Sequence, residues 1–173
     1  MILGLCGLAR CGKDSFFEYC KEYFEKKKIN CKRFAFADEL KKELDNFLVD
    51  NFKISSFSES EQEKITIRPL LVAYGCAKRD ISNGSYWIDK IKHDVENESE
   101  NGNVSIITDV RFENEINWVN SIGSSIHITK SGNEPPNEEE KENDPKVKSK
   151  AEHKIHWLDF EDFPCNDAKY VVF

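Results

Sequence analysis

A glycine-rich segment near the start of the chain combines residue types that bind phosphate. Residues 7–15 read GLARCGKDS and match the spacing G-x-x-x-x-G-K. Glycines allow close backbone approach, the N–H groups of the loop and of a following helix attract an anion, and lysine adds a positive charge. The alternative is a glycine turn that arose by chance, but such a turn would not need this spacing together with the lysine, a preceding strand and a following helix. We therefore expect nine residues to hold the phosphates of a nucleotide: Gly7, Leu8, Ala9, Arg10, Cys11, Gly12, Lys13, Asp14 and Ser15.

The residue after the lysine departs from the common form of this loop, which has Ser or Thr there as a Mg²⁺ ligand. Here Asp14 follows Lys13, and Ser15 comes next. Either side chain could touch the metal or its water shell, and Asp14 could equally cap the helix, so both roles stay open.

A second group of candidates follows the apolar run 104–108. Asp109 ends this expected strand, which is where nucleotide-hydrolysing and kinase folds hold Mg²⁺, directly or through water. Arg111, two residues on, could face a transferring phosphoryl group. The alternative is a helix cap or a structural ion pair between the two side chains.

Arginine usage gives an independent indication. Only five of the 25 basic residues are arginine, and arginine binds phosphate through a planar fork that lysine cannot replace. Arg10, Arg68, Arg79 and Arg111 fall in or near the candidate segments, whereas Arg33 is assigned to structure.

Residues 68–87, RPLLVAYGCAKRDISNGSYW, place cations beside aromatic rings. Such a helix could hold a phosphate at one end and stack a base at the other. In the alternative, the apolar residues are core and the cations are solvated, and Trp87 is more often core than base-stacking. The side chains concerned are Arg68, Lys78, Arg79, Tyr74, Tyr86 and Trp87.

Alternating strand and helix patterns must position these residues. Short apolar or alternating runs predict strands over 2–6, 32–36, 104–108, 125–129 and 169–173. Helical spacing predicts helices over 15–28, 39–51, 86–98 and 113–122, with Asp38 as an N-cap, a capping box from Ser58 to Glu61, and a helix starting at Pro69. Helices between strands make βαβ units, so we expect an α/β sandwich with a mostly parallel sheet and ligands beyond the carboxyl ends of its strands.

Length and composition limit the class of protein. The 173 residues suit one domain with a full core, and 39% hydrophobic residues are enough to fold. A net charge of −7 argues against nucleic acid as a partner. No run reaches the roughly 20 apolar residues of a membrane span, so we expect a cytoplasmic protein that does not contact membranes. The cysteines do not show the spacing of metal ligands, so we expect their thiols to be reduced and mostly buried. They are Cys6, Cys11, Cys20, Cys31, Cys76 and Cys165.

Residues 131–150, SGNEPPNEEEKENDPKVKSK, break the pattern. They contain no aromatic residue and little apolar surface, which indicates a solvated insertion. The alternative is a mobile lid over an active site.

These segments resemble the phage-type deoxynucleoside monophosphate kinases, a family with the P-loop kinase fold. The resemblance rests on GLARCGKDS, on FADELK at 36–41, on AYGCAKRD at 73–80 followed by SYW, and on TDVRFENE at 108–115. Glu39 stands where members often have Pro, Lys130 where they often have Arg, and SKAEH at 149–153 is only loosely similar to a His-x-Ser-Glu element.

The resemblance implies a P-loop kinase sandwich with a roughly five-stranded parallel sheet and a small lid. It implies ATP with Mg²⁺ as donor and a nucleoside monophosphate as acceptor. It favours a bacteriophage origin, with the host cytoplasm as location if the protein is viral, but phage or cellular origin stays open. Lys13, Arg79, Asp109 and Arg111 become catalytic candidates. The acceptor would contact Asp38, Lys41, Arg68, Tyr74, Arg79, Trp87 and Arg111, and the metal Asp14, Ser15 and Asp109.

Direct in-line transfer from ATP to the acceptor 5′-phosphate fits these residues, because positioning and charge stabilisation supply most of the catalysis of phosphoryl transfer. Three alternatives remain: another small-molecule kinase of this fold, acting on dephospho-coenzyme A or a nucleoside; a regulatory NTPase; and a nucleotide-binding module. The accepted bases, the preference for deoxyribose or ribose, and the formation of a homodimer stay open.

Overall fold

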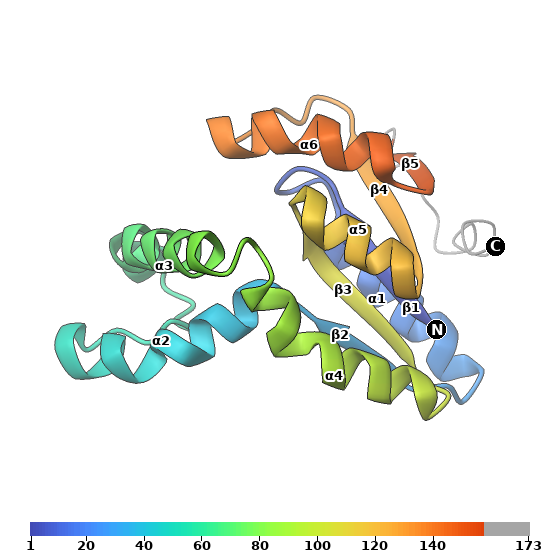
Figure 1. Cartoon of the computed structure of the whole chain (residues 1–173), viewed down its shortest axis with the longest axis horizontal. Helices are drawn as coiled ribbons and strands as arrows, with labels where there is room; N and C mark the ends of the chain where they lie inside the picture. The colour runs from blue at the N-terminus through green and yellow to red at the C-terminus, as the bar shows by residue number, and fades with distance from the viewer. Residues whose placement is uncertain (158–173) are drawn as a thin grey trace. The chain divides into compact units, whose positions relative to one another are not determined.

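The computed structural model describes residues 1–157 (Figure 1). Helices and strands alternate in the order β1 (Ile2–Cys6), α1 (Lys13–Lys26), β2 (Cys31–Phe34), α2 (Phe36–Phe52), α3 (Glu61–Ile81), α4 (Tyr86–Glu100), β3 (Val104–Val110), α5 (Glu113–Ile122), β4 (Ser124–Lys130), α6 (Glu138–Lys150) and β5 (His153–Trp157). The chain divides into two compact units, each described by itself. Among the described residues, the sheet unit holds residues 1–33 and 95–157, and the helical unit holds residues 34–94. The expectation of a single domain stays a prediction.

The sheet is five-stranded and parallel, in the order β2-β3-β1-β4-β5. In its centre Leu3 of β1 lies opposite Ile106 of β3 and Ser124 of β4. The predicted α/β sandwich with a parallel sheet is therefore confirmed. Because β1 lies between β3 and β4, the segments that follow these three strands emerge side by side at one edge of the sheet.

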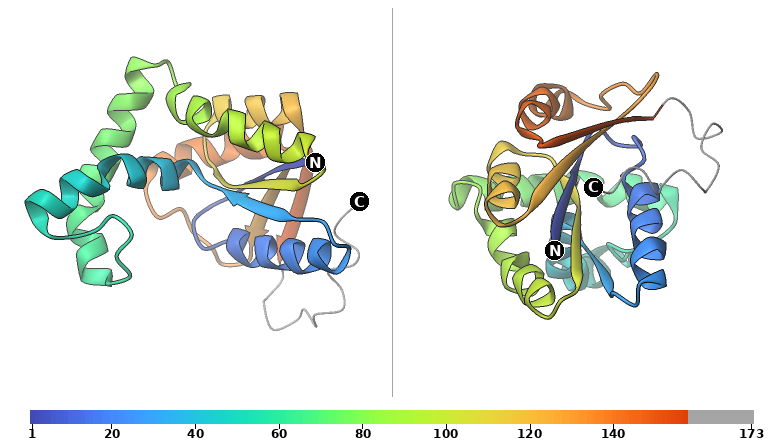
Figure 2. Two further views of the ribbon diagram at one scale, coloured as in Figure 1. Left: turned by 90° about the horizontal axis from the view of Figure 1, so that it is seen from below. Right: turned by 90° about the vertical axis from the view of Figure 1, so that its right-hand side faces the viewer.

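Helices cover both sides of the central strands (Figure 2). On one side Phe16, Cys20 and Phe24 of α1 pack with Leu5 and Ile106 in a cluster of buried side chains. On the other side α5 approaches so closely that a Cβ on Gly4 would lie 2.7 Å from Val119 Cγ1. This two-sided burial holds the ends of β1 and β3 in place.

Most predicted elements are confirmed within a few residues, but two helix starts differ. Helix α2 begins at Phe36 with Ala35 as its N-cap, so the predicted Asp38 cap was wrong. Phe36 is buried, so the apolar face of α2 begins before the predicted helix start. Asp38 lies in the first turn of the helix, where its negative charge interacts favourably with the helix dipole.

Helix α3 runs through Pro69, which was wrongly expected to start a helix. Its N-cap is Ser60, whose side chain accepts a hydrogen bond from the Glu63 N–H, rather than Ser58. Burial of Ile67 and Gly75 on either side of Pro69 explains why tertiary packing keeps the helix continuous across the proline.

The C-terminal part holds the largest difference from the sequence predictions. Residues 138–150 form α6, with Asn137 as its N-cap and Val147 buried, so this part is ordered, contrary to what its composition indicated. That the segment is an insertion or a lid stays a prediction. Strand β5 was not predicted, and the strand expected over 169–173 lies outside the described residues, as does Cys165.

Four of the described thiols, Cys6, Cys11, Cys20 and Cys31, are buried as predicted, and Cys76 is exposed. Within residues 1–157, no helix combines the length and apolar composition needed to cross a membrane.

Candidate functional site

The phosphate loop joins β1 to α1, as its sequence predicted. Gly7 has φ +129°, and a Cβ there would lie 2.2 Å from the Ile128 carbonyl oxygen. Gly12 also has a positive φ and is the N-cap of α1. Both glycines are therefore required by the backbone, and the loop leads its N–H groups into a helix N-terminus suited to an anion.

Lys13 is held against its own loop. Its side chain is buried, and Nζ donates to the carbonyl oxygens of Gly7 and Leu8, each at 2.7 Å. Burial raises the pKa of Cys11, which the neighbouring Lys13 ammonium offsets only in part, and burial raises the pKa of Cys6 to about 12. Both thiols therefore stay protonated, so neither adds a negative charge beside Lys13.

The segment after β3 brings its candidates to the same edge of the sheet. Asp109 is half-buried near the end of β3, where the next residue, Val110, pairs with Cys6 of β1. Glu115, which is buried, accepts hydrogen bonds from the N–H groups of Arg111 (2.8 Å) and Phe112 (3.1 Å). These bonds fix the backbone that presents the Arg111 guanidinium.

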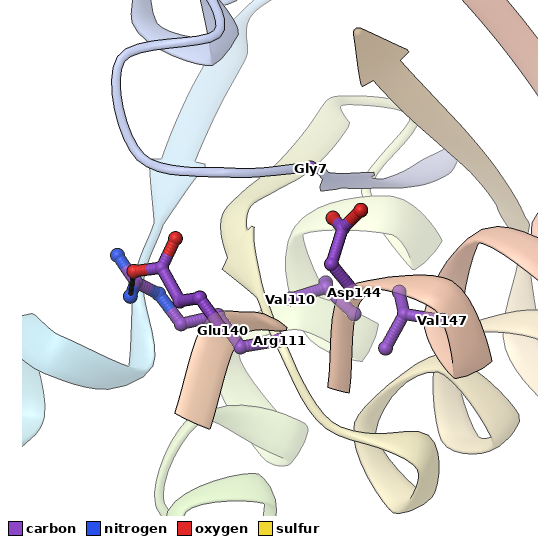
Figure 3. Close-up of a pocket in the computed structure, with 6 residues that line it drawn as sticks. All are labelled: Gly7, Val110, Arg111, Glu140, Asp144 and Val147. Carbon is purple, nitrogen blue, oxygen red and sulfur yellow. Dashed lines mark hydrogen bonds and ion pairs between the residues drawn. The ribbon is translucent and has the colours of Figure 1, made fainter. Parts of the chain in front are cut away.

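A small pocket lies between the loop and α6 (Figure 3). Its lining includes Gly7, Arg111, Glu140 and Asp144. Figure 3 shows the Arg111 and Glu140 side chains next to each other, and they form an ion pair, while the Asp144 carboxylate points toward Gly7. Arg111 thus pairs with Glu140, a partner that the sequence did not predict.

Two residues of the segment 131–150 hold the phosphate loop at Ala9. Asn133 Nδ2 donates to the Ala9 carbonyl oxygen at 3.0 Å, and Glu140 Oε2 accepts from the Ala9 N–H at 2.7 Å. Further along α6, Asp144 Oδ1 lies 3.0 Å from Nε2 of the buried His127. Sequence reasoning missed these polar contacts, although the Asn137-x-x-Glu140 spacing is a helix-start signal that could have revealed α6.

The remaining candidates belong to the helical unit. Asp38 and Lys41 are half-buried in α2, Arg68 is exposed and Arg79 half-buried in α3. Trp87 is only 4% exposed, and its Nε1 donates to the Gly75 carbonyl oxygen, which favours the core interpretation over base stacking. The structure therefore groups the loop with Asp109 and Arg111 in one unit, and the other acceptor candidates in the other.

A carboxylate that the sequence did not single out joins three segments of the helical unit. Glu43 Oε1 on α2 accepts from the hydroxyls of Tyr74 (2.7 Å) and Tyr86 (2.6 Å) and lies 3.3 Å from Lys78 Nζ. Lys90 Nζ lies 3.5 Å from Oε2. Burial raises the pKa of Glu43, but the hydrogen bonds from Tyr86, Tyr74 and Lys78 and the Lys90 charge outweigh it, so that the pKa falls to about 2. Its place among Leu40, Leu44 and Phe47 in the apolar periodicity of α2 was the available signal.

The sequence profile of deoxynucleotide monophosphate kinases matches residues 23–146, which is more than half of the chain. The chain belongs to the deoxynucleotide monophosphate kinase family. Family membership implies that this kinase is an ATP-dependent phosphotransferase that phosphorylates deoxynucleoside monophosphates. The phosphate loop precedes the matched residues, so its assignment rests on its own sequence and geometry.

Solved structures with the same fold are distant in sequence. A dephospho-CoA kinase from Campylobacter jejuni is 16% identical, with 93% of this chain and 90% of that one covered and a TM-score of 0.53. A shikimate kinase from Aquifex aeolicus is 17% identical, with 97% and 90% covered and a TM-score of 0.49. No curated protein matches the sequence of this kinase. The first similarity supports the P-loop kinase fold and nothing finer.

Proposed function

We propose that the kinase transfers the γ-phosphoryl group of Mg²⁺-bound ATP directly to the 5′-phosphate of a deoxynucleoside monophosphate. The observation that carries this proposal is the placement of the loop of residues 7–15 between β1 and α1, with Asp109 and Arg111 at the adjoining end of β3. The loop N–H groups and Lys13 hold the donor phosphates, and Arg111 neutralises charge on the transferred group.

The donor oxygens near the loop fit Mg²⁺. Asp14 lies exposed in the first turn of α1, Ser15 follows half-buried, and Asp109 is half-buried at the end of β3. Magnesium takes few protein ligands beside water and substrate phosphates, and it prefers such carboxylate and hydroxyl oxygens. Among residues 1–157 no cluster of three or more His, Cys, Asp or Glu side chains competes as a metal site. Bound there, the ion would neutralise charge on the donor phosphates.

The acceptor residues are proposed from the helical unit. Asp38 and Lys41 are three residues apart on α2 and therefore share a face. Arg68 and Arg79 lie on one side of α3, about 16 Å apart along its axis, so they would contact different parts of the nucleotide. Of the aromatic candidates we retain Tyr74, which is half-buried, because Trp87 is core.

In the reaction an oxygen of the acceptor phosphate attacks the γ-phosphorus, and the bond to the β,γ-bridging oxygen breaks to leave ADP. No covalent enzyme intermediate is needed, because the second pKa of a phosphomonoester is near 6 and its dianion is a competent nucleophile. The segment 131–150, which contacts the loop at Ala9, would act as a lid that keeps water from the γ-phosphoryl group.

The decisive test is ADP release from Mg²⁺-bound ATP with each common ribo- and deoxyribonucleoside monophosphate in turn. Release is expected only with particular deoxynucleoside monophosphates. Lys13→Ala should lower kcat by about 10²-fold or more, while Lys26→Ala, an exposed position on the same helix, should not. Acceptor-independent release, or a fully active Lys13→Ala variant, would contradict the proposal.

Arginine-to-lysine variants test the acceptor residues, because lysine keeps the charge and loses the bidentate fork. Arg68→Lys and Arg79→Lys are expected to raise KM for the monophosphate without changing the affinity for ATP. An unchanged KM would remove that arginine from the acceptor site.

We also propose that the kinase forms a homodimer. Within residues 1–156, the large apolar side chains that are most exposed, apart from Met1, all lie in the helical unit, and they include Phe47, Phe57, Ile65, Val72 and Ile81. Exposed apolar surface of this kind supports association.

A further inference from the structure

Glu140 occupies a position that the proposed function does not explain. It lies in the first turn of α6, where its N–H donates to the Asn137 side chain at 2.8 Å, and it is only 7% exposed. One carboxylate oxygen accepts from the Ala9 N–H of the phosphate loop at 2.7 Å, and the other pairs with the Arg111 guanidinium. A negative charge is therefore inserted between the two groups that best suit a phosphate.

The chemistry of this contact is that of a bound phosphate oxygen. Loop N–H groups and arginine bind carboxylates and phosphates through the same charge-assisted hydrogen bonds. Glu140, Arg111 and Gly7 also line the same pocket. A phosphate group that used the Ala9 N–H would have to take it from Glu140, because this N–H has a single hydrogen to donate. At Arg111 the two anions would repel each other, because the carboxylate and the phosphate would lie against the same guanidinium.

We propose that Glu140 is a resident anion of the donor site, which keeps Ala9 and Arg111 paired while no nucleotide is bound and is displaced by a phosphate of ATP. The inference rests on the proposed function, since it takes the loop of residues 7–15 as the donor site. Displacement releases Arg111 toward the transferred phosphoryl group, so the carboxylate lowers the affinity for ATP and ties the freeing of Arg111 to the arrival of the donor.

Other contacts hold α6 when Glu140 leaves. Asp144 lies 3.0 Å from His127, Val147 is buried, and Lys150 Nζ lies 2.8 Å from a carboxylate oxygen of Glu113. The displacement is thus a movement of one side chain and the first turn rather than a loss of the helix. For the same reason, variants of Glu140 are expected to fold.

A purely structural role makes the opposite prediction. If Glu140 only braced the loop and Arg111 for binding, its removal would loosen the donor site and weaken ATP binding. If it competes with phosphate, its removal strengthens ATP binding, because the nucleotide no longer has to break the ion pair. The sign of the change in affinity therefore separates the two roles.

The test is calorimetric titration of the full chain with Mg²⁺-bound ATP in the absence of acceptor. Glu140→Gln keeps the shape and removes the charge, and Glu140→Ala removes both contacts. The matched control is Glu139→Gln, an exposed neighbour in the same turn. We expect the Kd for ATP to fall by about tenfold in both Glu140 variants, the factor for one lost charge-assisted contact, and to stay unchanged in the control.

Thermal unfolding gives a second readout of the same competition. The rise in Tm on adding saturating ATP should be larger for the Glu140 variants than for the parent chain, because tighter binding adds more stability. An ATP affinity that is unchanged or weaker in both variants would overturn the inference while leaving the proposed function intact. Absence of ATP binding by the parent chain and the Glu139→Gln control would instead contradict the proposed donor site itself.

Discussion

At the scale of single residues, Gly7 is the position of the phosphate loop where backbone conformation and close packing together require a glycine. Its φ is +129°, and a Cβ at this position would lie 2.2 Å from the Ile128 carbonyl oxygen, so there is no room for a side chain. Gly7→Ala should therefore destabilise the fold by at least about 2 kcal/mol, or roughly 4–8 °C in Tm. Gly102→Ala is the control, because Gly102 also has a positive φ but no atom within 4 Å of a Cβ. Equal losses of Tm would show that backbone strain alone, and not the close approach, fixes Gly7.

The metal candidates make a second prediction at this scale. Removal of Mg²⁺ by chelation should abolish ADP release, and added Mg²⁺ should restore it. Asp109→Asn should raise the Mg²⁺ concentration for half-maximal activity by about tenfold or more. Asp14→Asn should have a smaller effect, because the exposed Asp14 acts through solvent. An unchanged Mg²⁺ dependence in Asp109→Asn would remove Asp109 from the metal site.

How far the site could be predicted depended on the kind of residue. Gly7, Gly12 and Lys13 are constrained by spacing within one short loop, so the sequence reveals them without knowledge of the fold. Glu140 and Glu43 gain their roles from partners far along the chain, 131 residues away for Ala9 and 31 for Tyr74. No local pattern encodes such a distance.

At the scale of elements, the same limit explains α6. The spacing of apolar residues in α1 and α5 predicted both helices, since most of the residues that these helices bury are apolar. The inward face of α6 carries Glu140 and Asp144 beside a single buried valine. The residues that repeat with helical spacing on this face are therefore mostly charged and not apolar. Hydropathy cannot detect a helix whose inward face is polar.

For the helical unit, the network around Glu43 predicts how stability depends on pH. Its hydroxyl and lysine partners join α2, α3 and the start of α4, and the pKa of the carboxyl lies at about 2, below its ordinary value of 4.5. A carboxyl with a lowered pKa in the folded state stabilises it above pH 4.5, and this stabilisation is lost as the pH falls toward 2.

Glu43→Gln should therefore lower Tm at neutral pH, and the difference from the parent chain should shrink as the pH falls below 4.5. Unfolding curves recorded between pH 2 and 7 measure the change, because this range covers the pKa of the carboxyl in both the unfolded and the folded chain. Glu61→Gln, at an exposed position on α3, is the control. A difference in Tm that does not depend on pH would show that the hydroxyl contacts matter and the charge does not.

At the scale of the whole molecule, charge and apolar surface act in opposite directions on association. Each chain carries a net charge of −7, which repels a second copy, whereas Ile65 (63% exposed) and Val72 (51%) offer apolar surface on one face of α3. For a dimer, the burial of such surface must outweigh the repulsion. Added salt screens the repulsion, so the dimer dissociation constant should fall as the ionic strength rises.

Sedimentation equilibrium is expected to give twice the chain mass of 20.1 kDa. An Ile65→Ser, Val72→Ser double variant should sediment as a monomer, because it places hydroxyls where apolar contact is needed. Ile81→Ser is the matched control, since Ile81 is even more exposed but falls on the opposite side of the same helix. If the control dissociates and the double variant does not, the pairing face lies on the other side of α3. If the parent chain sediments with the mass of one chain at every salt concentration, the kinase is a monomer.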